Sequence, residues 1–217
     1  MVTARAETPR ERYRAQVRAE IKSHAWEQIA SAGASALSLN AIAKRMGMSG
    51  PALYRYFAGR DDLITELVRD AHRSLADTLR AAADAGADLA GLAHALRDWA
   101  LADHQRYFLI HGTPVPGYRA PEDTTAVSAE IMTTLLDACP APAPAAPGAP
   151  FTAHLAQHRD WAGGHPAPPG ALRTFLAFWT RLHGVLSLEL AGHFAPMGFD
   201  PALLFAAEIE GLTAPGS

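Results

Sequence analysis

Apolar residues recur at the period of an α-helix along most of this 217-residue sequence. In the first stretch that shows the pattern, Tyr13, Val17, Ile21, Ala25 and Ile29 stand four positions apart. Residues at that spacing lie on one face of a helix, and we expect this face to be buried. No segment has a convincing strand pattern. The sequence therefore predicts an all-α fold.

Capping residues and glycines mark where the helices begin and end. Thr8 and Glu11 have the spacing of a capping box, so a first helix starts there after a loose tail, and Gly33 ends it. Other helices are predicted at Ser38–Met46, Ser49–Phe57, Asp61–Leu79, Leu89–Ala102, Gln105–His111, Glu122–Asp137, Phe151–Trp161, Ala171–Phe194 and Pro201–Leu212.

Two stretches are rich in proline and glycine, CPAPAPAAPGAP at 139–150 and GGHPAPPG at 163–170. Such composition is typical of extended loops or linkers. We expect both to lie on the surface and to bracket a short helix.

The composition excludes several classes of protein. With 49% hydrophobic and 19% charged residues, the chain can bury a sizeable core without disulfides or a structural metal. Cys139 is the single cysteine, so an internal disulfide framework is excluded. There is no run of eighteen apolar residues and no leader typical of secretion. We expect a cytoplasmic protein that does not enter a membrane.

The charge is distributed unevenly along the chain. Residues 1–60 carry ten Lys/Arg against four Asp/Glu, whereas residues 61–217 carry nine against eighteen. A basic small domain joined to an acidic larger one suggests that the basic domain binds a polyanion. We therefore expect a nucleic-acid-binding domain at 1–60 and a second domain at 61–217, linked by the helix that begins near residue 61.

A helix-turn-helix is predicted at residues 37–63, LSLNAIAKRMGMSGPALYRYFAGRDDL. Ile42 faces inward on the first helix, Leu53 and Phe57 do so on the second, and Gly47 permits the sharp turn between them. This pattern predicts two short helices locked nearly perpendicular. The other face of the second helix is then left to project outward.

The outward face carries chemical groups that can bind DNA. Tyr54, Arg55 and Tyr56 follow one another, Ser49 stands at the amino end, and Arg60 lies just past the carboxyl end. Hydroxyl groups and helix N-terminal amides bind phosphate, and an arginine in the major groove can pair with guanine through two hydrogen bonds. The pattern therefore predicts a DNA-reading surface.

Over about residues 10–72 the sequence resembles the TetR family of transcriptional regulators, through Pro51-Ala52-Leu53-Tyr54-Arg55-Tyr56-Phe57 and the basic residue that follows. The resemblance implies that Tyr54, Tyr56 and Arg60 hold phosphates and that Arg55 and Asn40 approach bases. One unit offers few base contacts, so we expect a homodimer on a palindromic double-stranded DNA operator. The predicted DNA contacts are Ser38, Asn40, Lys44, Ser49, Ala52, Tyr54, Arg55, Tyr56 and Arg60.

The C-terminal part is similar to one TetR subfamily, whose WxxxHG motif matches Trp179, His183 and Gly184. This resemblance implies that the last two helices form a four-helix bundle with a second copy, and that a small-molecule effector enters a pocket. The predicted interface residues are Leu182, Val185, Leu186, Leu190, Phe194, Leu203 and Leu204. The predicted pocket residues are Trp99, Tyr107, Phe108, His111, Trp161 and Trp179.

No motif points to catalysis or to a cofactor. His154 and His158 stand four apart, yet no third metal-ligating residue has a suitable spacing, so we expect no metal. The sequence therefore predicts a one-component repressor, not an enzyme, that a small molecule releases from its operator. Two alternatives stay open: an all-α ligand-binding protein or enzyme whose helix-turn-helix serves packing, and a DNA-binding protein without sequence preference.

Overall fold

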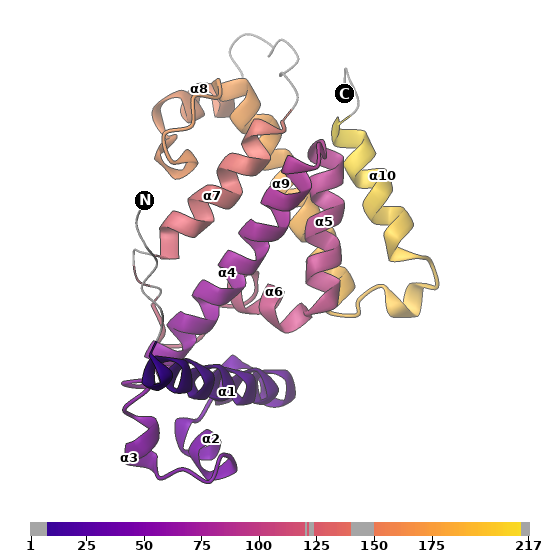
Figure 1. Ribbon diagram of the computed structural model, residues 1–217. Coiled ribbons are helices and arrows are strands. Elements are labelled where there is room, and N and C mark those ends of the chain that lie inside the picture. The colour runs from indigo at the N-terminus through magenta and orange to yellow at the C-terminus, as the bar shows by residue number, and fades with distance from the viewer. Residues whose placement is uncertain (1–7, 120, 122–123, 140–149, 214–217) are drawn as a thin grey trace. The chain divides into compact units, whose positions relative to one another are not determined.

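The computed structural model describes residues 8–119, 121, 124–139 and 150–213 (Figure 1). These residues form ten α-helices and three short 3₁₀ segments without any strand, which confirms the all-α prediction. The predicted tail before Thr8 and residues 140–149 of the first Pro-rich stretch lie outside the described residues.

The described chain divides by compactness into two units. Unit 1 contains the residues up to Asp70 together with residues 108–119, and unit 2 contains residues 71–107 and those from Pro121 onward. This division differs from the expected one at residues 60 and 61 in two respects. The first turns of the linking helix belong to unit 1, and so does the segment of residues 108–119 further along the chain.

Local signals in the sequence explain the helices of unit 1. The capping box is confirmed, because the Glu11 amide donates to Thr8 Oγ1 and the Thr8 amide donates to Glu11 Oε2. Gly33 ends the first helix with φ 78°, a value that favours glycine. The helical segments of unit 1 are α1 (Pro9–Ala32), η1 (Ala34–Ala36), α2 (Leu39–Arg45), α3 (Gly50–Leu53) and the start of α4 (Arg60–Asp84).

The core of unit 1 is formed by the predicted apolar faces and by one segment that the pattern does not reveal. Tyr13 is an exception to the expected buried face of α1, since 64% of its surface is exposed. Leu109, Ile110, Val115 and Tyr118 pack against the core from residues 108–119. The buried residues are Val17, Ile21, Ala25, Ile29, Leu37, Leu39, Ile42, Ala43, Leu53, Phe57, Leu63, Ile64, Leu67 and Val68.

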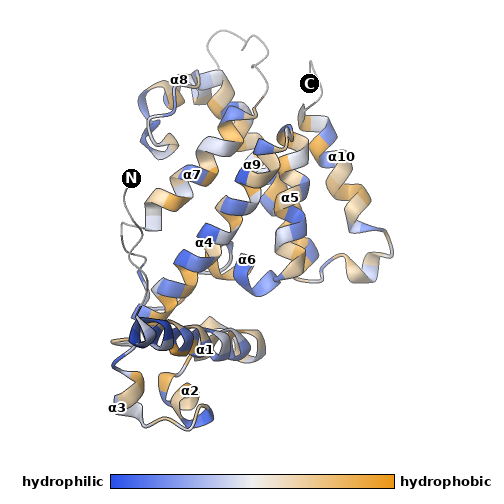
Figure 2. Ribbon diagram, viewed as in Figure 1, coloured by the Kyte–Doolittle hydropathy of each residue, from blue (hydrophilic) through white to orange (hydrophobic). Residues whose placement is uncertain are grey.

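Unit 2 is built around α9 (Pro169–Leu190), which packs against most of the other helices of the unit. Hydrophobic and hydrophilic residues alternate along α4, as a helix with one buried face requires (Figure 2). None of the helices in the described ranges is long and apolar enough to cross a membrane. The helices with the most extensive contacts to α9 are α5 (Leu89–Ala102), α7 (Thr124–Asp137), α8 (Pro150–Gln157) and α10 (Pro201–Thr213).

Four further segments belong to the unit: the part of α4 from Ala71 onward, η2 (Asp160–Ala162), η3 (Ala195–Met197) and the first half of α6 (His104–His111). The helix predicted at Phe151–Trp161 is thus split into α8 and η2. The helix predicted to reach Phe194 ends at Leu190, because the chain turns at Gly192 with φ 77°.

One ion pair inside unit 2 joins α5 to α9. The Arg97 guanidinium donates to both carboxylate oxygens of Glu189, at 3.0 Å from Nε and 2.5 Å from Nη2. The side chains are only 14% and 10% exposed, and the guanidinium also lies 5.6 Å from the centre of the Phe205 ring on α10. This pair therefore ties three helices together.

Candidate nucleic-acid interface and C-terminal sites

The turn between α2 and α3 has the geometry that the sequence predicts. Gly47 has φ 65°, and the Met48 amide closes the turn on the Ala43 carbonyl at 2.8 Å. Leu53 and Phe57 are fully buried and anchor the second helix to the core of unit 1. However, α3 ends at Leu53 rather than near Phe57, so the residues after it form turns.

The nine predicted DNA contacts divide by exposure into two groups. Asn40, Lys44, Ser49, Tyr54 and Arg55 are exposed on α2, α3 and the following turns, and 48% of the Tyr54 surface is accessible. These five are free to meet another molecule. The remaining four, which are half-buried, are Ser38, Ala52, Tyr56 and Arg60.

Two of the half-buried residues have structural partners. Ser38 Oγ accepts from the Ala41 amide at 3.3 Å and so caps α2. The Arg60 guanidinium donates to the carbonyls of Ala34 and Ser35, at 3.0 and 3.3 Å. Ser38 therefore caps α2, as its position at the start of the predicted helix indicates, and Arg60 stabilises the fold of unit 1 through contacts that the sequence did not predict.

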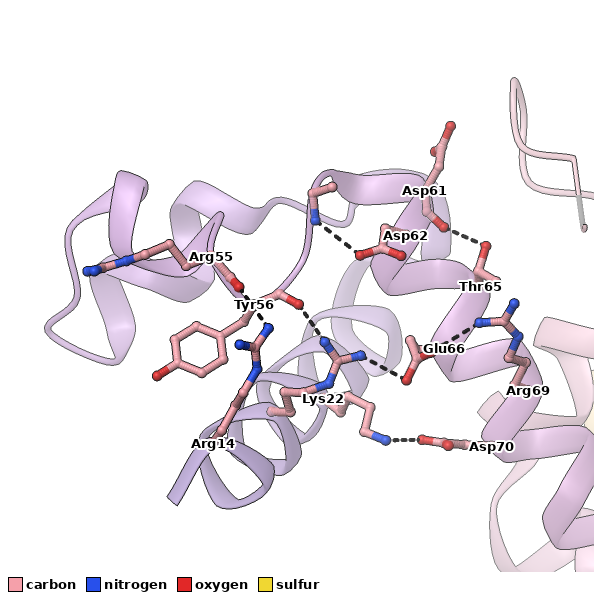
Figure 3. A network of polar contacts seen from close by, with 12 residues as sticks. Arg14, Lys22, Arg55, Tyr56, Asp61, Asp62, Thr65, Glu66, Arg69 and Asp70 are labelled. Carbon is pink, nitrogen blue, oxygen red and sulfur yellow. Dashed lines mark hydrogen bonds and ion pairs between the residues drawn. The ribbon is translucent and has the colours of Figure 1, made fainter. Parts of the chain in front are cut away.

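Sequence reasoning missed two arginines of α1. Arg14 Nη2 donates to the Arg55 carbonyl at 3.3 Å, and Arg18 Nη1 donates to the Tyr56 carbonyl at 2.5 Å. Figure 3 shows the Arg55 side chain extending away from the carbonyl that Arg14 contacts. The available signal was the presence of two arginines four positions apart on the polar side of α1, which places them on the same face.

Ion pairs hold α1 against the first turns of α4. Arg18 pairs with Glu66 at 3.0 Å. Lys22 pairs with Asp70 at 2.6 Å (Figure 3). Burial raises the pKa of Glu66, but hydrogen bonds and charges from Arg18, Arg69 and Lys22 outweigh it and hold the pKa below its ordinary value. Glu66 is therefore a carboxylate that balances the cations of α1.

In unit 2, a buried polar group joins α6 to α9. The Tyr107 hydroxyl, which is fully buried, lies 2.9 Å from His183 Nδ1 and 3.1 Å from Ser187 Oγ. Burial raises the pKa of Tyr107, partly offset by the Ser187 hydrogen bond, and burial lowers the pKa of His183 to about 4. At neutral pH this group is therefore uncharged.

Three of the predicted pocket residues are linked through aromatic contacts. Trp179 contacts the His183 ring, with centroids 4.0 Å apart, and Phe175 lies between Trp179 and Trp161, 6.0 Å from each. Trp99 donates from Nε1 to Ser74 Oγ at 3.1 Å. Tyr107, Trp161 and Trp179 are thus connected through His183 and Phe175, while Trp99 joins α5 to α4.

Phe108 and His111 belong to unit 1, because they follow the point at which α6 passes from one unit to the other. The expected effector pocket stays a prediction.

The predicted dimer residues also divide by exposure. Leu182 and Leu186 are fully buried within one chain, and Phe194 is 8% exposed. These three belong to the core of unit 2, so their burial does not support a role in an interface. Val185, Leu190 and Leu204 are half-buried, and 71% of the Leu203 surface is exposed.

Within the described ranges, no three metal-ligating side chains gather at one place. His154 and His158 form a stacked pair with ring centroids 3.9 Å apart.

Two family models match the sequence. Residues 21–67 match the model described as bacterial regulatory proteins, tetR family, and residues 89–212 match the model described as tetracyclin repressor-like, C-terminal domain. The first match covers the helix-turn-helix, and the second covers most of unit 2.

Several known proteins are similar over nearly the whole chain. The HTH-type transcriptional regulators Rv1816 of Mycobacterium tuberculosis and Mb1846 of Mycobacterium bovis are each 35% identical over 218 residues, covering 93% of this chain and 92% of theirs. The crystal structure of SCO4313, described as a candidate regulatory protein, has 72% identity and a TM-score of 0.88, covering 96% of this chain and 100% of that one. A protein of unknown function from Rhodococcus sp. RHA1, at 21% identity and a TM-score of 0.64, shares the fold over 90% of this chain and 92% of its own.

Proposed function

This chain belongs to the TetR family of bacterial transcriptional regulators, and from this premise we propose that it is a cytoplasmic, one-component repressor. It binds a palindromic operator as a homodimer and leaves it when a small molecule enters the C-terminal domain. The observation that carries the DNA-binding part is the exposure of Tyr54 and Arg55 next to a backbone that α1 holds in place. Exposed hydroxyl and guanidinium groups are the chemistry that phosphates and guanine edges require.

The exposed residues of α2 add to this surface. Lys44 offers a phosphate contact, and Asn40 can pair with adenine. Asn40 Oδ1 would lie 3.6 Å from a Cβ at Gly50, so the amide stands at the start of α3. We assign direct contacts to Asn40, Lys44, Ser49, Tyr54 and Arg55, with contributions from Ala52 and Tyr56.

Exposed apolar side chains on α9 and α10 support the proposal of a homodimer. Leu188 on α9 is 45% exposed and Leu203 near the start of α10 is 71% exposed, and apolar side chains that gather on a surface mark protein–protein interaction sites. Gly184 and Ala207 are exposed on the same two helices and would allow close approach of a second copy. We therefore move the centre of the proposed four-helix interface from Leu182 and Leu186 to these exposed residues.

The effector site is proposed on the aromatic side of α9. Trp179, His183 and Gly184 form the WxxxHG pattern, and we place the C-terminal domain in that subfamily. The rings of Trp161 and Trp179 offer apolar faces, and Tyr107 with His183 offers neutral hydrogen-bonding atoms. Such a lining suits a largely apolar, uncharged ligand.

The experiment that tests the DNA-binding proposal is selection of bound sequences from a random duplex pool at fixed salt. An enriched palindrome with half-sites about one helical turn apart is expected. Tyr54→Phe and Arg55→Ala should then weaken binding to the enriched duplex, and Arg55→Ala should also relax the preference at one base position.

Arg173 is a matched control, since it is an exposed arginine on α9, outside the reading surface. Arg173→Ala should bind as the parent does. Parent-like binding by Arg55→Ala would overturn the assignment of the reading residues. Binding without any enriched sequence would favour a DNA-binding protein without sequence preference.

A further inference from the structure

The residues that face DNA in the proposed function lie in or next to a very short helix. α3 contains only Gly50–Leu53, and Tyr54 to Tyr56 follow in turn conformation. Two hydrogen bonds of its own hold this turn, from the amides of Tyr56 and Phe57 to the Leu53 carbonyl, at 2.8 and 3.3 Å. A four-residue helix is not stable by itself, so its geometry has to come from neighbouring elements.

The carbonyls of Arg55 and Tyr56 lie in the turn after α3, and side chains of α1 donate hydrogen bonds to both. Arg14 donates to the Arg55 carbonyl and Arg18 donates to the Tyr56 carbonyl. The two donors come from side chains four positions apart on one helix, and that helix is anchored in the core through Val17 and Ile21. The turn that presents Arg55 is therefore fixed to a rigid element.

Arg18 is held from three sides. Its Nη1 contacts the Tyr56 carbonyl, its Nη2 lies 3.0 Å from Glu66 Oε2, and its guanidinium carbon lies 4.2 Å from the centre of the Phe57 ring. The side chains of Arg18 and Glu66 are 28% and 25% exposed. Only a planar guanidinium can make these three contacts together, because an ammonium presents no flat face and no fixed fork.

We propose that Arg18 is a positioning residue for DNA reading, which fixes the turn at Tyr54–Tyr56 so that the Arg55 side chain meets the base edges, without itself binding DNA. Figure 3 shows the arrangement that this requires, with the Arg55 side chain extending away from its own carbonyl while the carbonyls of this turn accept from α1 side chains. This inference rests on the proposed DNA-binding function.

The test compares Arg18→Lys with Lys22→Gln in the full-length protein. Lys22 is the matched control, because its ion pair with Asp70 also joins α1 to α4 but does not reach the reading turn. For each variant, we would measure affinity for the selected operator, affinity for an unrelated duplex, the salt dependence of both, and the melting temperature.

Arg18→Lys should lower operator affinity about 10-fold to 100-fold, the range expected when a charged hydrogen-bond donor is lost. Affinity for the unrelated duplex should change by less than about threefold, because the phosphate contacts and net charge are kept. Lys22→Gln should keep the parent's ratio of operator to unrelated affinity. Glu66→Gln retains the Arg18 guanidinium but weakens its ion pair, so it should lower the ratio of operator to unrelated affinity by a smaller factor. This variant replaces Arg18→Lys in the test if Arg18→Lys fails to fold.

Other outcomes would overturn the inference. If Arg18→Lys binds the operator like the parent and Arg18→Gln reduces the salt slope by about one, Arg18 is a phosphate contact. If Arg18→Lys and Lys22→Gln lose the same ratio in proportion to their melting temperatures, the role is general stability. If the parent itself selects no sequence, the proposed function fails instead.

Discussion

Acidification should destabilise the folded protein through His183, and the size of the effect follows from its pKa. Burial lowers this pKa from 6.5 to about 4, so the unfolded chain binds the proton more readily than the folded protein. Stability is therefore complete above about pH 7 and is lost as the pH falls from 6.5 toward 4. The full difference is about 3 kcal/mol, of which about 2 kcal/mol is lost at pH 5.

Denaturant unfolding at about pH 7.5 and pH 5, followed by circular dichroism, measures this loss. Other groups also titrate, so the parent is compared with His183→Asn, which keeps a hydrogen-bonding atom for the Tyr107 hydroxyl but has no ionisable ring. The variant should start less stable, because it loses the contact with Trp179, and should fall by about 2 kcal/mol less between the two pH values. An equal fall in both proteins would refute the reasoning.

Three further predictions concern stability and assembly. Glu189→Leu leaves the Arg97 guanidinium buried without its partner and should lower the free energy of unfolding by about 3 kcal/mol. Adding Arg97→Met should restore most of the lost stability, and a double variant as unstable as Glu189→Leu would contradict this. Gly47→Ala should cost about 1 kcal/mol in denaturant unfolding, because φ there is 65°, whereas Gly59→Ala should cost almost nothing; equal costs would show that the turn is not strained. Leu203→Glu should convert dimers to monomers in sedimentation, whereas Phe151→Glu, at a similarly exposed site on α8, should not; a monomeric parent would remove the dimer proposal.

Local patterns predicted much of the first part of the chain. Thr8, Gly33, Ser38 and Gly47 act where the sequence places them, because caps and turns depend on a few neighbouring residues. The end of α3 was predicted too late, since the apolar spacing of Leu53 and Phe57 also fits a turn that α1 holds from outside.

Long-range contacts were not predictable from spacing. Arg60 has the right type and position for a phosphate contact, yet the carbonyls of η1 engage it from residues far earlier in the chain. Leu182 and Leu186 lie on an apolar face of α9, but a periodic pattern cannot tell a face that packs inside one chain from one that meets a second copy. The exposed fractions show that Leu182 and Leu186 pack inside one chain.

Residues 108–119 give the DNA-binding unit a part that is distant in sequence. The Thr65 hydroxyl donates to the Asp61 carbonyl at 2.8 Å, so the Tyr118 hydroxyl, 3.1 Å away, must be the donor to Thr65. This hydrogen bond ties the segment to α4 from within the same unit.

A helix-turn-helix cut out at residue 84 would therefore lack part of its own interior. A fusion that joins unit 1 to another ligand-binding domain has to include Phe108–Arg119. During synthesis, unit 1 cannot finish folding until the ribosome has released these residues.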